Sequence, residues 1–230
     1  MKGHGQFCPV AVACEVFAHR WTPLILRELL AGSTHFNEIK RGLPLISKTT
    51  LAQRLRALEQ AGVVRCVSAA DTHRQEYRLT AAGEEFKSVI QGLGAWGQRW
   101  TIRVDPHNLD ADLLMWNIRR RLAPDRIPAM RRVVRFDFSG MPSQQRRNRV
   151  FWLIVERPDV DLCVQDPGAD VDLYVQADLQ AFARVWLGDL ALPTALRSGL
   201  IKLTGHRQLM REFPSWLLLS HFAGVPRPSA

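Results

Sequence analysis

Apolar and polar positions repeat with a helical period over most of the first hundred residues. The spacing predicts helices within residues 8–18, 23–31, 35–42, 47–61 and 81–100. Thr22 is expected to cap the second of these helices, with Pro23 at its first position, and Thr80 to cap the last. Residues 63–69 and 76–80 alternate with period two, which predicts an antiparallel hairpin around a polar turn. Helices followed by a hairpin and one more helix are typical of a winged helix-turn-helix.

The helix predicted within residues 47–61 has an apolar face with a clear start and end. The spacing i, i+4, i+7 predicts one buried stripe, formed by Leu51, Leu55 and Leu58. Ser47 can accept hydrogen bonds from the free N–H groups of the first turn, and Gly62 can supply a left-handed exit.

The opposite face of that helix is polar and basic. It presents Thr49, Gln53, Arg56 and Gln60, with Thr50 beside them. A face that is only solvated usually mixes both signs of charge in i, i+4 pairs, but this one has no acidic residue before Glu59. Helix N-terminal amides and hydroxyls hold phosphate, and Gln and Arg reach base edges in the major groove. The pattern therefore favours contact with duplex DNA.

The second half of the chain changes from helices to alternating strands and helices. Strands are predicted at residues 132–138, 150–156, 160–166, 170–176 and 200–205. Helices are predicted at residues 109–123, 179–189, 192–199 and 206–222, the last of them broken at Pro214. A composition break at Asp105-Pro106 separates the halves, so we expect domains 1–104 and 105–230. The fold class is α+β, the second domain having a sheet with helices on one face.

The charge of the chain favours an anionic partner. The net charge is +9, and residues 1–104 hold 14 Lys and Arg against 8 Asp and Glu, compared with 17 against 14 in residues 105–230. The arginine runs 119–121 and 131–132 could touch DNA flanks, although a solubilising role is the preferred interpretation. The chain has no apolar run near the roughly 18 residues of a membrane span, and its first 21 residues fit a folded helix better than a signal peptide. The expected location is the cytoplasm, without membrane insertion.

Metal, cofactor and catalytic chemistry are not expected. The four cysteines form no CxxC pair, and the seven histidines show no ligand spacing. The carboxylates near the predicted strands fit turn and solvent roles, and no nucleophile–base pair or phosphate loop stands out. An enzyme is therefore not expected.

The first half resembles a known family over about residues 8–97. The carrying motifs are the Cys-Pro start, Arg-Trp-Thr before the second helix, Phe-Asn-Glu-Ile, Ile-Ser, Leu-x-x-x-Leu-x-x-Leu-Glu and Tyr-Arg-Leu-Thr-x-x-Gly. They resemble the HxlR-type winged helix-turn-helix regulators. The resemblance implies a homodimer on near-palindromic operator DNA, with dimer contacts from the terminal helices of the module. It also implies DNA contacts by Lys48, Thr49, Thr50, Gln53 and Arg54, flanked by Ser47 and Arg56, and by Arg74 of the hairpin tip in the minor groove or on phosphate.

Cys8 carries an alternative hypothesis. The family that the first half resembles includes members that sense oxidants or electrophiles through a cysteine at this place. A helix start also favours the thiolate. The competing interpretation is a small residue buried at a dimer contact. Cys14 and Cys66 are expected to be structural.

The last third of the second half resembles sterol-carrier-protein type 2 domains. The pattern is Gly188, Ala195, Ser198-Gly199, Ile201, Leu203 and Gly205 after a strand-to-helix step. The resemblance implies an apolar tunnel for a fatty or sterol-like ligand, with Trp116 and Trp186 as candidate ligand residues; ordinary core packing is the competing interpretation. Three hypotheses follow: a ligand-responsive regulator, a thiol switch with a structural second domain, and a lipid carrier. The hydroxyl-rich start of the helix argues against the carrier.

Overall fold

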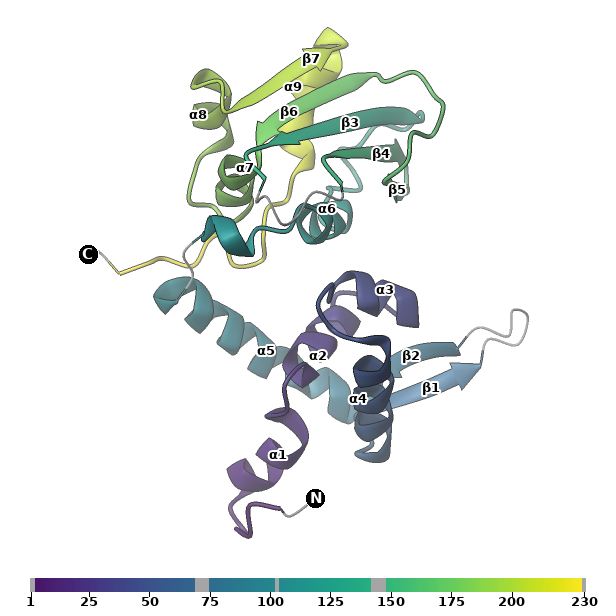
Figure 1. The fold of residues 1–230 in the computed structure, drawn as a ribbon, viewed down its shortest axis with the longest axis vertical. Helices are drawn as coiled ribbons and strands as arrows, with labels where there is room; N and C mark the ends of the chain where they lie inside the picture. Colours follow the sequence, from purple (N-terminus) through teal and green to yellow (C-terminus); the bar gives the residue numbers. More distant parts are fainter. Residues whose placement is uncertain (1–2, 69–74, 102–103, 142–147, 229–230) are drawn as a thin grey trace. The chain divides into compact units, whose positions relative to one another are not determined.

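The structure is a computed structural model that describes residues 3–68, 75–101, 104–141 and 148–228. The chain forms two compact units, residues 1–94 and 95–230, and the division falls within a single helix, α5 (Ala81–Trp100). Figure 1 shows a mostly helical first unit and a second unit built on a sheet. Among the residues that the structure describes, no helix is both long enough and apolar enough to cross a membrane.

The first unit has the predicted element order. Its elements are α1 (Pro9–Phe17), α2 (Thr22–Leu30), α3 (Phe36–Arg41), α4 (Lys48–Gln60), β1 (Val64–Ser68), β2 (Gln75–Leu79) and the first part of α5. Ile25, Leu26 and Ile39 are fully buried at its centre, together with the predicted leucine stripe of α4. The stripe prediction is confirmed, because Leu51, Leu55 and Leu58 are each at most 1% exposed.

One predicted cap of this unit is wrong and two are confirmed. Trp21 has a left-handed backbone with φ of 79°, which makes Trp21 the N-cap of α2 and places Thr22 inside the helix, where it is buried. Ser47 caps α4 as predicted, and the Thr80 hydroxyl accepts from the Gly83 N–H at the start of α5 (3.2 Å). Gly62 has a φ of +70° and gives α4 its left-handed exit.

The hairpin is bonded to the end of α4 and to the segment before α3. Strands β1 and β2 pair antiparallel from Val64 opposite Leu79 to Ser68 opposite Gln75. The Thr80 hydroxyl donates to the Gly62 carbonyl (2.7 Å), and the Tyr77 amide donates to the Thr34 carbonyl (2.7 Å). The hairpin is therefore the wing of a winged helix-turn-helix.

The second unit is a five-stranded sheet covered by helices. Its elements are η1 (Pro106–Asn108), α6 (Ala111–Arg119), β3 (Arg132–Ser139), β4 (Val150–Glu156), β5 (Asp159–Cys163), β6 (Leu173–Asp178), α7 (Leu179–Trp186), α8 (Leu192–Arg197), β7 (Ile201–Gly205) and α9 (Arg207–Trp216). The strand order is β5-β4-β3-β6-β7; β3 and β6 are parallel and every other pair is antiparallel.

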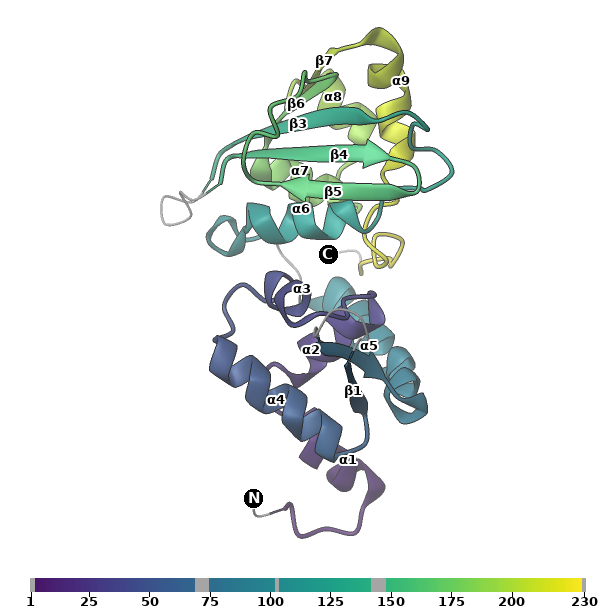
Figure 2. The same cartoon turned by 90° about the vertical axis from the view of Figure 1, so that its right-hand side faces the viewer.

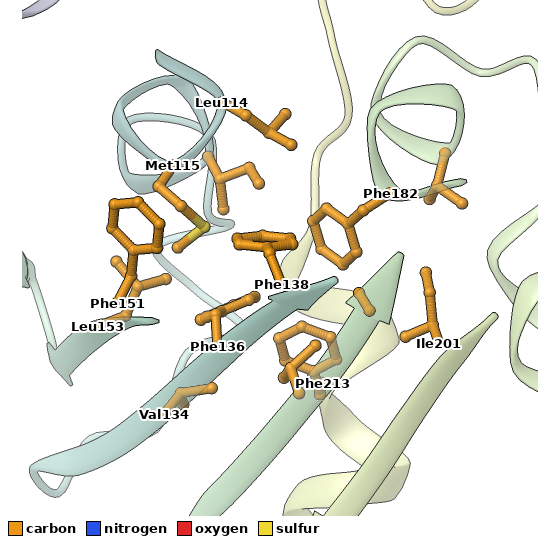
Figure 3. Close-up of a cluster of buried hydrophobic side chains, with 14 of the residues drawn as sticks. Leu114, Met115, Val134, Phe136, Phe138, Phe151, Leu153, Phe182, Ile201 and Phe213 are labelled. Carbon is orange, nitrogen blue, oxygen red and sulfur yellow. The ribbon is translucent and has the colours of Figure 1, made fainter. Parts of the chain in front are cut away.

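The helices and one face of the sheet enclose the core of the second unit. Figure 3 shows Leu114 and Met115 of α6 and Phe182 of α7 around Phe138 of β3, with Phe213 of α9 beside Phe136. Figure 2 looks onto the opposite face of the sheet, with α7 and α9 behind the strands. The predicted mixture of strands and helices, with helices on one face, agrees with this arrangement.

Two details of the second unit differ from prediction. Helix α9 continues through Pro214, which removes one helical N–H donor, and ends two residues later at Trp216. The arginine run at the end of α6 does not simply solubilise the chain. Arg119 donates to the Val160 carbonyl of β5 (2.8 Å), and Arg121 donates to the carbonyls of residues 218 and 219 (2.8 and 3.0 Å).

Candidate nucleic-acid interface

The first turn of α4 is capped by one side chain. The Ser47 Oγ accepts from the Thr50 N–H (3.0 Å) and lies 2.8 Å from the Thr50 hydroxyl. The amides of Lys48 and Thr49 belong to the same turn and have no acceptor within the helix. Together with the positive end of the helix dipole, they can receive a phosphate oxygen.

The side chains around this turn are polar and at least partly accessible, and Lys48, Arg54 and Arg56 among them are positively charged. Ser47, Lys48, Thr49, Gln53 and Arg56 are exposed, and Thr50 and Arg54 are half-buried. Within the described residues no ion pair holds Lys48 or Arg54.

The acidic residue of α4 faces away from this turn. The Glu59 carboxylate accepts from the Cys66 amide of β1 (3.3 Å), so it faces the wing rather than the start of α4. Figure 2 shows α4 on the surface of the first unit, next to the hairpin. The predicted Arg74 lies outside the described residues.

The turn that leads into α4 is rigid. The Ile46 amide donates to the Leu43 carbonyl (3.1 Å), which closes a β-turn with Pro44 and Leu45 at its tip. The Lys40 ammonium donates to the Pro44 carbonyl (2.9 Å) and the Leu43 carbonyl (3.4 Å). Because Leu43 and Ile46 are buried, the turn is fixed on both sides of its exposed tip.

A buried carboxylate supports the same turn from inside, and the sequence reasoning missed it. Glu28 of α2 is fully buried, and its carboxylate accepts hydrogen bonds from Arg27 Nη2 (2.8 Å) and the Ser33 hydroxyl (3.3 Å). Arg27 Nη2 also donates to the Gly42 carbonyl (2.9 Å), directly before the turn. The signal in the sequence is an acidic residue beside the buried apolar positions of α2. A buried charge is tolerated only when it is paired in this way.

The start of α3 has its own carboxylate. Glu38 accepts from the amides of Thr34 (3.0 Å) and His35 (3.1 Å). Partial burial raises the pKa of Glu38, but the amides of His35 and Thr34 outweigh it, and the net pKa lies below the ordinary value. The ionised carboxylate therefore stabilises the helix that precedes α4.

The cysteines of the first unit differ in their ionisation. Cys8 is exposed at the N-cap of α1, where its side chain makes no capping hydrogen bond. The nearby backbone N–H groups of Ala11 and Val10 lower the pKa of its thiol. Burial, with a contribution from Glu59, raises the pKa of the Cys66 thiol. Cys8 is therefore the more nucleophilic of the two.

The two tryptophans predicted for a ligand lie in different settings. Trp116 is buried, with the guanidinium groups of Arg119 and Arg120 at 5.1 and 5.3 Å from its ring centre. Trp186 is half-buried and packs against the core of the second unit. Among the described residues, no group of three or more His, Cys, Asp or Glu side chains could hold a metal ion.

A three-helix core, a wing and an exposed basic helix after a tight turn define a winged helix-turn-helix of the DNA-binding regulator class. Comparison with known proteins agrees: the HxlR-like helix-turn-helix model matches residues 16–105. The HTH-type transcriptional regulator YvaP of Bacillus subtilis is 36% identical over 107 residues, which are 46% of this chain and 96% of that protein. The chain belongs to the HxlR-like helix-turn-helix family.

Other relatives match a similar share of the chain. Rv3095 of Mycobacterium tuberculosis, an HTH-type transcriptional regulator, is 40% identical over 95 residues, which are 41% of this chain and 60% of that protein. The reduced form of the regulator YodB from B. subtilis is 33% identical, with a TM-score of 0.37, and covers 42% of this chain and 96% of its own. The oxidised form of the redox regulator HypR is 28% identical, with a TM-score of 0.38, and covers 40% and 95%. These relatives are transcriptional regulators, and no enzyme family is indicated.

Proposed function

We propose that this chain binds double-stranded operator DNA as a homodimer and thereby regulates transcription, with the first turns of α4 in the major groove. The observation that carries this proposal is the exposed, capped start of α4. There Lys48 is in solvent and the one acidic residue of the helix, Glu59, is engaged by the wing. Family membership supports DNA binding as the general activity.

The roles of the α4 residues follow from their chemistry. Ser47, Lys48, Thr49 and Thr50 are close to the helix N-terminus and suit phosphate oxygens. Gln53, Arg54 and Arg56 are one to two turns further along and have the length to reach base edges. Arg74, which precedes β2 in the sequence, would add a minor-groove or phosphate contact.

Apolar exposure on two helices supports the homodimer. Val10 of α1 and Val89, Leu93 and Trp96 of α5 are all exposed. Ile90 of α5 is buried in the core, so the exposed residues belong to the remaining side of that helix. A second copy of the same chain would remove this apolar surface from water. Sedimentation of the wild type should show a dimer, and Leu93→Glu should shift it towards monomer.

The test of operator binding is selection from a random pool of duplexes followed by anisotropy titration. The wild type should enrich a near-palindromic sequence and hold it against competitor DNA. Gln53→Ala should lose preference at particular bases, whereas Lys48→Ala should weaken binding to all duplexes and reduce the salt dependence. Binding without any sequence preference would contradict the proposal.

A thiol switch at Cys8 is a second candidate, favoured by the exposure of this thiol and its lowered pKa. An oxidant or electrophile would then release the DNA. Alkylation should be faster at Cys8 than at Cys66 at neutral pH, because the thiolate is the reacting species. Cys8→Ser should abolish the oxidant response and Cys66→Ser should keep it. A response that survives Cys8→Ser excludes the switch.

We further propose that the second unit is a sterol-carrier-like domain whose ligand modulates operator affinity. The support is the layer of helices on one face of the sheet and the apolar interior they enclose, against which Trp186 packs. Phe136, Phe182 and Phe213 fill this interior, so an apolar ligand would have to open the helical layer.

Native mass spectrometry of fresh protein should detect a bound lipid, and fatty ligands should raise the Tm. A ligand that changes Tm and operator affinity supports the regulator. A ligand that changes Tm alone supports the carrier alternative, and no ligand effect at all contradicts both.

A further inference from the structure

Leu45 is the most exposed leucine of the described residues and lies where the chain enters α4. Its side chain is 85% exposed, although Leu43 and Ile46 on either side of the turn are only 2% exposed. A single exposed leucine is ordinary on a protein surface. The position of Leu45, rather than its exposure alone, indicates a function.

The position is fixed by the turn described above. Leu45 is at the tip of the β-turn closed between Ile46 and Leu43, directly after Pro44, whose ring restricts the backbone. Lys40 holds the carbonyl of Pro44 at 2.9 Å. Leu45 is therefore presented on a pre-organised backbone, and little backbone entropy is lost when it makes a contact.

The turn ends where the proposed DNA contacts begin. Leu45 is two residues before the N-cap Ser47 and three before Lys48. The N-terminal residues of a recognition helix are those that approach base edges. The one apolar group that base pairs present in the major groove is the 5-methyl group of thymine.

We propose that Leu45 is a specificity residue that contacts a thymine 5-methyl group in each operator half-site, beside the bases read from the first turns of α4. This inference rests on the operator binding proposed above. It adds an apolar element to a surface that is otherwise composed of hydroxyls, amides and cations.

The test uses the full-length dimer and the duplex selected by the wild type. Each thymine of the half-site is replaced in turn by deoxyuridine, which lacks the methyl group but pairs identically. For the wild type, one position should lose about fivefold in affinity, the value expected for one buried methyl group. Leu45→Ala should bind the unmodified duplex about fivefold more weakly and should be insensitive to deoxyuridine at that position, so the two losses are not additive.

Two further variants control the measurement. Leu45→Met keeps an apolar side chain and should retain both the affinity and the sensitivity to deoxyuridine. Leu200→Ala makes the same truncation at an exposed leucine of the second unit and should match the wild type. Because Leu45 is exposed, its variants should keep the wild-type Tm.

Each remaining outcome overturns the inference in an identifiable way. If Leu45→Ala binds like the wild type, Leu45 has no role in recognition, and operator binding still stands. If Leu45→Ala binds more weakly but keeps the wild-type deoxyuridine profile, Leu45 contacts something other than the methyl group, and the proposal is wrong. If the wild type selects no sequence at all, both this inference and the proposed function fail.

Discussion

Lys48 and Arg56 on α4 of the first unit extend into solvent, whereas arginines at the end of α6 in the second unit turn back onto their own chain. Lys48 is exposed beside a capped helix start. Arg119 and Arg121 instead donate to backbone carbonyls of β5 and of the segment after α9. In sequence the arginine run could touch DNA flanks, although a solubilising role was the preferred interpretation. Whether a run of basic residues is available to bind DNA therefore depends less on its number of charges than on how many backbone carbonyls of the same fold its side chains can reach.

The largest expected effect is on the unfolding free energy, and it tests whether the two units have separate cores. Phe136→Ala should lower the unfolding free energy of the second unit by about 3–5 kcal/mol, since it empties the centre of that core. Leu55→Ala should cost the first unit about 2–5 kcal/mol for the same reason. Hydrogen exchange with mass spectrometry should show each loss of protection in the unit that carries the change. Equal loss of protection in both units by either variant would contradict separate cores.

Truncation of one basic residue in each unit tests the comparison directly. Arg121→Ala should destabilise the second unit by about 2 kcal/mol, because two carbonyls lose a charged donor, and should leave duplex binding unchanged. Lys48→Ala should leave the unfolding free energy unchanged and weaken duplex binding. Urea unfolding and anisotropy titration measure the two effects. If Arg121→Ala weakens DNA binding as much as Lys48→Ala, the contrast between the units is wrong.

Helix caps give a matched pair with a smaller effect. Ser47→Ala should cost about 1 kcal/mol of unfolding free energy, because the Thr50 amide loses its acceptor. Asp178→Ala removes the equivalent bond to the Ala181 amide at the start of α7. Both should lower the Tm by a similar amount, but only the change at Ser47 should weaken operator binding. If the two variants bind DNA with equal affinity, Ser47 is not part of the interface.

The smallest expected effect depends on pH and concerns Glu38 at the start of α3. Since its folded pKa lies below the ordinary value of 4.5, its stabilisation is present above about pH 4.5 and is lost as the pH falls through the folded pKa. Glu38→Gln keeps the bonds to the two amides but cannot titrate. The wild type should exceed this variant in unfolding free energy at pH 7, by about 0.5 kcal/mol or less, and the difference should shrink as the pH falls through the folded pKa. A difference that stays constant with pH would contradict the assignment.

Periodic features of the sequence were sufficient to predict much of the first unit. The leucine stripe, the Ser47 cap and the Gly62 exit depend on local spacing, and each is confirmed. Thr22 was misassigned because a left-handed turn at Trp21, which no spacing reveals, places it within α2.

Features that depend on contacts between separate elements could not be predicted from the sequence. Arg27 and Glu28 are neighbours in sequence, but the burial of Glu28 and the bond from Arg27 to the Gly42 carbonyl appear only when α2 meets the turn after α3. Packing likewise decides which apolar residues of α5 are covered, because Ile90 is buried and Leu93 is exposed. The DNA contacts of α4, the boundary between the domains and the ligand residues Trp116 and Trp186 stay predictions.

The parallel pairing of β3 with β6 has a consequence for synthesis of the chain. Val134 pairs with Leu173, so the centre of the sheet cannot close until two intervening strands have left the ribosome. The helices and wing of the first unit are complete much earlier and join residues close in sequence. The DNA-binding unit can therefore fold while the β3–β5 strands still carry an open hydrogen-bonding edge, which is the stage at which the nascent chain is most exposed to aggregation.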